Sequence, residues 1–324
     1  MTSFNFDRAA IEDACDRLAA RIVATPTLLL NGARLTAALP EDASVFLKME
    51  LFQQAGSFKA RGVLLAIDAM QAAERQVGVT AVSAGNHALA VSWGAHDAGL
   101  SAKVVMPKTA DPVRVEGCRA MGAEVILKDN VSEAFAECDR LVAEEGRTML
   151  HPFESPYMVL GAASVGLELA LAAPDLDCAV LPIGGGGLIA GMALGIKAVQ
   201  GDCTIIGVEP EGADAMSRSL AAGAPFHLEK VETIADSLGA PMALPKTFAI
   251  ARQHVEEIIR LPDAAMQSTM RLLYDGLKIV AEPACAASTA AIRGPLRDRL
   301  AGKRVAAIAC GSNIGLEKFA RLMG

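Results

Sequence analysis

Short apolar segments of strand length alternate along the chain with longer segments of helical period. Because strands that are apolar throughout are typical of parallel sheets covered by helices on both faces, this alternation predicts an α/β fold. The segments expected as strands are Ser44–Met49, Val79–Val82, Ala102–Met106, Glu124–Leu127, Cys178–Ile183, Thr204–Val208 and Val305–Cys310. The segments expected as helices are Phe58–Ala73, Asn86–Ala98, Pro112–Met121, Ser132–Glu145, Leu188–Val199 and the end of the chain.

The strand–helix units fall into two groups. Those between about residues 78 and 150 are consecutive and compact, so we expect them to form a lobe inserted in the larger sheet. We assign residues 1–50 and 155–324 to a large lobe and residues 51–154 to a small one. Parallel sheets bind ligands at the carboxyl ends of their strands, so the turns that follow strands are the first candidates for a site.

The composition excludes several classes of protein. The 324 residues are 52 % apolar and carry a net charge of −7, with no Lys/Arg cluster and only 4 % aromatic residues. We therefore expect neither nucleic acid nor an anionic membrane as a partner, but a small molecule. The seven cysteines are widely spaced and form no Cys-x-x-Cys motif, which argues against a disulfide framework and a zinc site. With no secretion signal at the N-terminus, we expect a cytoplasmic protein.

The turn Gln54–Gly62 places a lysine where a helix is expected to begin. Ser57 is a suitable N-cap, which puts Lys59 in the first helical turn. The positive end of the helix dipole disfavours a cation there. Two interpretations stay open on this segment alone: a solvated lysine, or an amine with a lowered pKa that is suited to Schiff-base chemistry.

The turn Ser83–His87 also follows a strand and opens a helix. Its backbone amides, with Ser83 and Asn86, would present donors at a helix N-terminus, which is an anion site. His87 lies beside them, and we favour slightly its interpretation as a helix-start histidine with no catalytic role. In the last strand-to-helix turn, Cys310 is interpreted as a buried structural cysteine, although its position also allows contact with a ligand.

Four consecutive glycines, Gly184 to Gly187, interrupt an uncharged stretch that imitates a membrane span. We expect a strand, a turn and a helix there, because a glycine run is a poor helix in lipid. Backbone N–H groups without side chains can wrap a phosphate. The loop also fits a dinucleotide-binding pattern loosely, with Gly185, Gly187 and Ala190 followed by Glu209 at the end of the next strand.

Together these turns resemble the fold-type II enzymes that use pyridoxal phosphate, in particular the threonine/serine dehydratase and serine racemase group. The resemblance spans nearly the whole chain and implies a two-lobed, tryptophan synthase beta-like fold. It implies that Lys59 forms a Schiff base with the cofactor and that Phe58 lies against its ring. It further assigns Asn86, Gly184, Gly185, Gly186, Gly187, Glu282 and Cys310 to the cofactor, and Ser83, Ala84, Gly85, Asn86 and His87 to the substrate.

The resemblance also implies an activity. A 3-hydroxy amino acid would displace Lys59, which then takes the Cα proton while the hydroxyl leaves as water. The products would be a 2-oxo acid and ammonia. The resemblance also implies a dehydratase of amino-acid catabolism and a homodimer. A thiol at Cys310 does not protonate the ring nitrogen strongly, which favours elimination over transamination.

Several residues depart from the family pattern. Ala84 replaces the second serine of the racemases, so we expect racemisation to be poor. Ala162 and Ala163 replace longer or polar family residues, so we expect a pocket that tolerates a substrate bulkier than serine, unless this segment packs against the core without meeting the substrate. Ser237 replaces a glycine that normally lies over the ring, which also puts serine and threonine in doubt as substrates. Glu209 and the Ala213 carbonyl match part of a site for Mg²⁺ or another divalent cation, whose third, acidic ligand is absent because Ala215 stands there.

Two alternative functions stay open. One is an amino-acid racemase of the same fold. The other is a dinucleotide-binding oxidoreductase built on the glycine loop and Glu209, which would leave Lys59 and Asn86 without a function.

Overall fold

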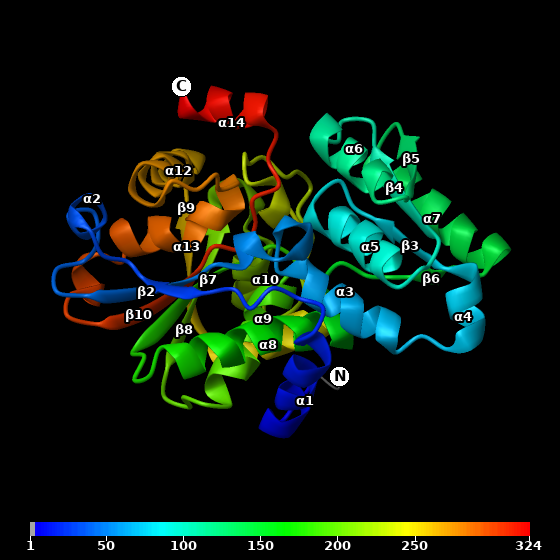
Figure 1. Ribbon diagram of the computed structural model, residues 1–324. Coiled ribbons are helices and arrows are strands. Elements are labelled where there is room, and N and C mark those ends of the chain that lie inside the picture. Colours follow the sequence, from blue (N-terminus) through cyan, green and yellow to red (C-terminus); the bar gives the residue numbers. More distant parts are fainter. Residues whose placement is uncertain (1–3) are drawn as a thin grey trace.

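The computed structural model, which describes residues 4–324, contains two sheets flanked by helices (Figure 1). The strands are β1 (Thr27–Leu29), β2 (Ser44–Lys48), β3 (Val79–Val82), β4 (Ala102–Pro107), β5 (Glu124–Lys128), β6 (Thr148–Met149), β7 (Cys178–Pro182), β8 (Thr204–Pro210), β9 (Val255–Leu261) and β10 (Arg304–Ile308). The helices are α1 (Arg8–Leu18), α2 (Ala33–Thr36), α3 (Lys59–Asp68), α4 (Ala72–Val77), α5 (Asn86–Asp97), α6 (Pro112–Ala120), α7 (Val131–Glu145), α8 (Pro156–Ala172), α9 (Gly187–Lys197), α10 (Ala215–Ala222), α11 (Pro245–His254), α12 (Asp263–Leu277), α13 (Pro283–Arg293) and α14 (Leu316–Met323). Short 3₁₀ helices span Glu50–Phe52, Gln54–Gly56, Glu211–Ala213, Asp236–Leu238 and Asp298–Leu300.

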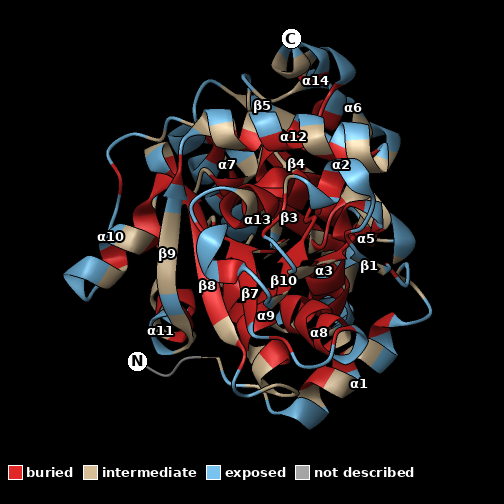
Figure 2. Cartoon of the chain, turned by 90° about the vertical axis from the view of Figure 1, so that its left-hand side faces the viewer, coloured by how far each residue is buried: buried red, intermediate tan, exposed pale blue. Residues whose placement is uncertain are grey.

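The larger sheet has six strands in the order β1-β2-β10-β7-β8-β9. All neighbours are parallel except β1, which pairs antiparallel with β2. Helices α8 and α9 lie below this sheet in Figure 1, and α12 and α13 lie above it. Every residue of the central strand β7 is buried, as the red strands of Figure 2 show. The strand is therefore covered on both faces, which explains its continuous apolar sequence.

The smaller sheet has four parallel strands in the order β5-β4-β3-β6. Along β4, Val104 and Met106 pack in the cluster that includes α5, whereas Val105 packs with residues of α7. Helices therefore cover both faces of this sheet too, and the predicted fold class is confirmed. The sheet lies within the small lobe assigned to residues 51–154, whose boundaries stay a prediction.

One predicted helix differs from the structure, whereas the stretch around the four glycines matches it. The single helix expected over Phe58–Ala73 is divided, because α3 ends at Asp68 and Gln71 starts α4 through a capping box with Glu74. The uncharged stretch around the four glycines is β7, a turn and α9, as expected. Among the helices described, none combines the length and the apolar character that crossing a bilayer requires.

Candidate active site

A cavity of about 260 Å³ lies where strands of both sheets end. Its walls come from the start of α3, the β3–α5 turn, the β7–α9 turn and the segment that follows β10. The predicted residues that line it are Phe58, Lys59, Ser83, Ala84, Gly85, Asn86, His87, Gly184, Gly185, Gly186, Gly187 and Cys310. The structure thus brings together turns that are up to 250 residues apart in the chain, while the roles assigned to them stay predictions.

Lys59 is the first residue of α3 and reaches the cavity. Its Nζ donates a hydrogen bond to the Pro152 carbonyl and lies 5.2 Å from the centre of the Phe58 ring. Burial lowers the pKa of this amine to about 8. The structure therefore favours an amine with a lowered pKa over a solvated lysine.

The expected N-cap of α3 is wrong. The cap position belongs to Phe58, and Ser57 is extended and forms a β-bridge with Gly311. The Ser57 hydroxyl is buried without a hydrogen-bond partner in the described structure. Tertiary pairing with the segment after β10 has therefore replaced the local cap.

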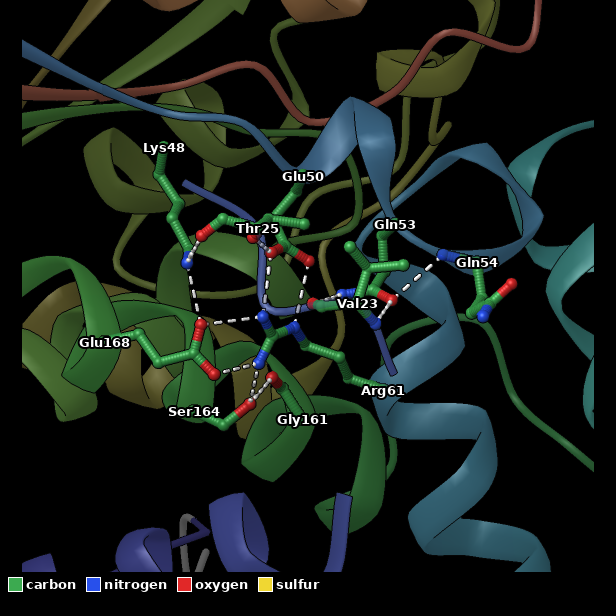
Figure 3. Close-up of polar contacts among 10 residues, drawn as sticks. All are labelled: Val23, Thr25, Lys48, Glu50, Gln53, Gln54, Arg61, Gly161, Ser164 and Glu168. Atoms are coloured by element: carbon green, nitrogen blue, oxygen red, sulfur yellow. Dashed lines mark hydrogen bonds and ion pairs between the residues drawn. The ribbon is translucent and has the colours of Figure 1, made fainter. Parts of the chain in front are cut away.

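A buried network of ion pairs anchors α3 two residues after Lys59 (Figure 3). The guanidinium of Arg61 donates to both carboxylate oxygens of Glu50, at 2.9 and 2.8 Å, and to both oxygens of Glu168, at 2.6 and 2.8 Å. Lys48 approaches Glu168 to 2.7 Å from the other side. The network joins α3 to α8 and to the end of β2, so it fixes the helix start from which Lys59 projects.

Asn86 begins α5 and binds three other segments through its amide. Its Nδ2 donates to Glu282 Oε1 at 2.6 Å and to Ser237 Oγ at 3.3 Å, and its Oδ1 accepts from Asn313 Nδ2 at 2.7 Å. Burial raises the pKa of the Glu282 carboxyl to about 7, although Arg114 opposes that shift. Glu282 itself lies behind Asn86 and is not part of the cavity wall.

Sequence reasoning missed Arg114, which borders the cavity from α6. Its guanidinium donates to Asp236, to the Asn313 carbonyl at 2.9 Å and more weakly to Glu282 at 3.4 Å. The signal was present in the sequence, since Arg114 is a cation in the first turn of a helix, as Lys59 is. Its partners come from distant loops, which no local pattern identifies.

The glycine loop leads into the N-terminus of α9. The helix begins at Gly187 after Gly186, whose φ of 90° is accessible to glycine but strained for other residues. The first N–H groups of a helix have no intrahelical partner, and among the residues described no side chain caps this terminus. These N–H groups can therefore donate to an anion. The residues present therefore fit a phosphate group.

Gly185 has no room for a side chain. A Cβ there would lie 2.3 Å from a ring carbon of Phe153. We expect Gly185→Ala to displace the loop and raise the dissociation constant of a phosphate-bearing cofactor about tenfold or more, the cost of one weakened charged hydrogen bond. Gly201→Ala is the control, because a Cβ at Gly201 meets nothing within 4 Å. Equal cofactor binding by both variants, measured by absorbance titration, would contradict the role of the loop.

Cys310 and His87 both line the cavity in uncharged forms. Burial raises the pKa of the Cys310 thiol well above its usual range. Burial also lowers the pKa of His87 to about 3, and its Nε2 bonds the Leu150 carbonyl at 2.7 Å. A neutral, carbonyl-bound imidazole agrees with the interpretation of His87 as a residue without a catalytic role.

The residues expected for a divalent cation do not fit one. Both oxygens of Glu209 accept hydrogen bonds from the start of α10, from Met216 N at 2.8 Å and from Ser217 N and Oγ at 2.8 and 2.7 Å. Burial raises the pKa of this carboxyl to about 7. Within residues 4–324, no group of three His, Cys, Asp or Glu side chains could hold a metal ion. Glu209 therefore stabilises a helix N-terminus, which also removes it as a ribose ligand.

The expectation that Ala162 and Ala163 enlarge the substrate pocket is wrong. Both lie in α8, almost fully buried, and pack where α8 crosses the glycines Gly191 and Gly195 of α9. They are small because the two helices approach closely there. Ser237, which also departs from the family pattern, does line the cavity.

Known proteins resemble this chain over most of its length. Residues 21–311 match the model of a family described as "Pyridoxal-phosphate dependent enzyme". A phenylserine dehydratase of Ralstonia pickettii is 46 % identical over 87 % of this chain and 86 % of its own length. An L-threo-3-hydroxyaspartate ammonia-lyase of a Pseudomonas species is 35 % identical over 87 % of this chain and 88 % of its own length. The structure of maize serine racemase superposes with a TM-score of 0.90 at 33 % identity, covering 98 % of this chain and 96 % of that one.

Proposed function

Because the chain belongs to the pyridoxal-phosphate dependent enzymes, we propose that it dehydrates a 3-hydroxy amino acid with a bulky, phenylserine-like side chain. The products are a 2-oxo acid and ammonia, so the enzyme is an ammonia-lyase. The family assignment removes the dinucleotide-binding oxidoreductase as an alternative. A divalent cation forms no part of the proposal.

The residues around the cavity fit the cofactor. When bound, pyridoxal phosphate supplies an aldehyde for the substrate amine and a sink for the electrons left when Cα loses its proton. We assign the cofactor phosphate to the N–H groups of Gly184 to Gly187 and the covalent bond to Lys59. We assign the neutral thiol of Cys310 to the ring nitrogen, to which it would not give a proton. Asn86, held by Glu282 and Asn313, orients the ring.

The substrate is held and deprotonated by residues on two sides of the cavity. Ser83 Oγ accepts a hydrogen bond from Gly85 N at 3.1 Å, which leaves its own proton free to donate to the substrate carboxylate. We assign the transfer of the Cα proton to the Lys59 amine, which would act as the base. A pKa of about 8 suits this step, because about a tenth of the amine is already the neutral base at pH 7 and this fraction rises with pH.

The small, apolar side chains of the remaining cavity wall support a phenylserine-like substrate. Ala84, Leu238, Gly239, Ala240 and Ala284 are small or apolar. Besides Lys59, the charged side chains lining it are Arg114 and Asp236, which pair with each other at 2.8 Å. A second carboxylate on the substrate would find no unpaired cation there, whereas a phenyl ring needs none. The phenylserine dehydratase relative supports the same choice.

Racemase activity is disfavoured by one position. Racemisation requires a second acid or base on the face opposite Lys59, and the family resemblance places Ala84 there. A methyl group cannot move a proton, so we assign elimination as the main reaction.

A panel of 3-hydroxy amino acids tests the proposal. The holoenzyme is assayed for 2-oxo acid and ammonia with serine, threonine, 3-hydroxyaspartate and phenylserine. We expect phenylserine to have the highest kcat/KM, about tenfold or more above serine, since pocket contacts of this size discriminate on that scale. If serine or threonine is the best substrate, the phenylserine assignment is wrong.

We further infer a cytoplasmic homodimer. None of the seven cysteines is paired, although six are buried, and this supports a reducing compartment. Leu29 and Phe52 are each 47 % exposed, which provides apolar surface for a second copy. Light scattering of the purified protein measures its mass directly, and a monomer would contradict this inference.

Replacing Ser83 separates substrate binding from cofactor binding. Ser83→Ala removes one hydrogen bond to a charged carboxylate, which costs about 1.5–3 kcal/mol. We expect KM to rise about tenfold or more while the cofactor absorbance stays unchanged. A spectral change as large as the change in KM would assign Ser83 to the cofactor instead.

A further inference from the structure

The active-site cavity shares one wall with a larger hollow. This second space, about 810 Å³, lies between α6 and α14. Ala84, Arg114 and Asp236 line both spaces. These three residues therefore lie between the place expected for the substrate and the hollow outside.

The wall is a two-pronged ion pair. Arg114 Nη1 donates to Asp236 Oδ2 at 2.8 Å, and Nη2 donates to Oδ1 at 3.3 Å. Nη1 also lies 3.4 Å from the Ala84 carbonyl, which joins the pair to the substrate loop. The Arg114 side chain is 4 % exposed, whereas that of Asp236 is 39 % exposed. The carboxylate is thus the accessible half of the wall.

Arg114 is held independently of Asp236. Its Nε donates to the Asn313 carbonyl at 2.9 Å, and its Nη2 lies 3.4 Å from Glu282 Oε2. Removing the Asp236 side chain therefore opens the wall while Arg114 keeps its contacts with Asn313, Glu282 and the Ala84 carbonyl. The reverse change would leave the buried Glu282 without its cation, so Asp236 is the better position to alter.

The hollow beyond the wall offers apolar surface beside the charged side chains of Asp111, Glu317, Lys318 and Arg321. Val113 at the start of α6 is 57 % exposed, and Leu316 at the start of α14 is 78 % exposed. Both line the hollow, with Pro112 between Val113 and the α6 cap. An aryl group that passed the wall would find both room and apolar contacts.

We propose that the Arg114–Asp236 ion pair is the specificity wall of this enzyme, which limits how long the side chain of the substrate can be. The inference rests on the proposed dehydratase function and deepens it. The wall admits a phenyl ring and excludes 3-hydroxy amino acids whose aryl group carries a second ring in the para position. Shortening Asp236 joins the two spaces and admits the longer group.

The test compares two substrates in matched variants. The ratio of kcat/KM for 4-phenyl-phenylserine to that for phenylserine is measured in the unaltered holoenzyme and in Asp236→Ala. We expect the ratio to rise about tenfold or more in the variant, because relief of a steric limit in an apolar pocket acts on this scale. The corresponding ratio of dissociation constants, from absorbance titration, should fall, because tighter binding of the longer compound lowers its dissociation constant.

Lys318→Ala is the matched control. Lys318 Nζ lies 3.1 Å from Asp236 Oδ2 and lines the hollow but not the active-site cavity, so this variant loses an ion pair without opening the wall. The kcat/KM ratio of the two substrates in Lys318→Ala should equal that of the unaltered enzyme. Asp236→Ser replaces Asp236→Ala if thermal unfolding shows that the alanine variant does not fold.

The outcomes separate the two proposals. If a folded Asp236 variant has the same kcat/KM ratio for the two substrates as the unaltered enzyme, the proposed wall is wrong. It is also wrong if Lys318→Ala raises that ratio as much as the Asp236 variant does. If the unaltered enzyme does not act on phenylserine, the proposed substrate fails. The ratio of dissociation constants still decides whether the wall limits the length of a bound amino acid.

Discussion

Replacing Lys59 with alanine should abolish dehydration and covalent attachment of the cofactor together. Lys59 Nζ is the amine that lines the cavity, and we assign to it both the bond to the cofactor and the transfer of the Cα proton. Loss of the covalent and the base functions predicts a fall in kcat of at least about 10³-fold. Lys108→Ala is the control, because Lys108 forms a surface pair with Asp129 and should leave the rate unchanged.

Borohydride reduction provides a readout that does not depend on turnover. Mass spectrometry of the reduced holoenzyme should find the cofactor on the peptide that contains Lys59, and the alanine variant should carry none. Since burial lowers the pKa of the free amine to about 8, reconstitution of the apoprotein should accelerate as pH rises through that value. A cofactor fixed at another lysine would refute the assignment.

The turns of the site could be predicted because each is a local pattern. A cation in the first turn of a helix, amide donors before Asn86 and a run of glycines all follow strands. The carboxyl ends of parallel strands lie at the same edge, so such turns meet in space. What held these turns together could not be predicted, because Arg114, Asp236 and Asn313 come from three distant segments.

Helix α8, which the sequence did not predict, lacks the expected amphipathic period. α8 is almost wholly apolar because it packs between α3 and α9, and its buried residues occupy all sides. Periodicity cannot identify a helix that has no solvent-facing side. The same close packing explains the error at Ala162 and Ala163, where small residues reflect contact with another helix and not a ligand pocket.

Replacing Arg61 with methionine should cause a large loss of stability. Arg61 and Glu50 have no exposed side-chain surface, so the variant leaves a buried carboxylate without its cation. Breaking such a pair costs about 3–5 kcal/mol in the free energy of unfolding. Arg140→Met is the matched control, because Arg140 is 42 % exposed and pairs with Glu137 and Glu144 on the surface of α7. Exposed ion pairs contribute about 0–1 kcal/mol to the free energy of unfolding, so Arg140→Met should lose no more than that.

Chemical denaturation of the two apoprotein variants measures this difference. If Arg61→Met lowers the free energy of unfolding no more than Arg140→Met does, water or a protonated Glu50 replaces the missing cation. A second measurement connects stability with the site. Because Arg61 anchors α3 two residues after Lys59, Arg61→Met should also weaken cofactor binding under conditions where the variant is folded. Unchanged cofactor affinity in the folded variant would limit the network to a structural role, separate from the positioning of Lys59.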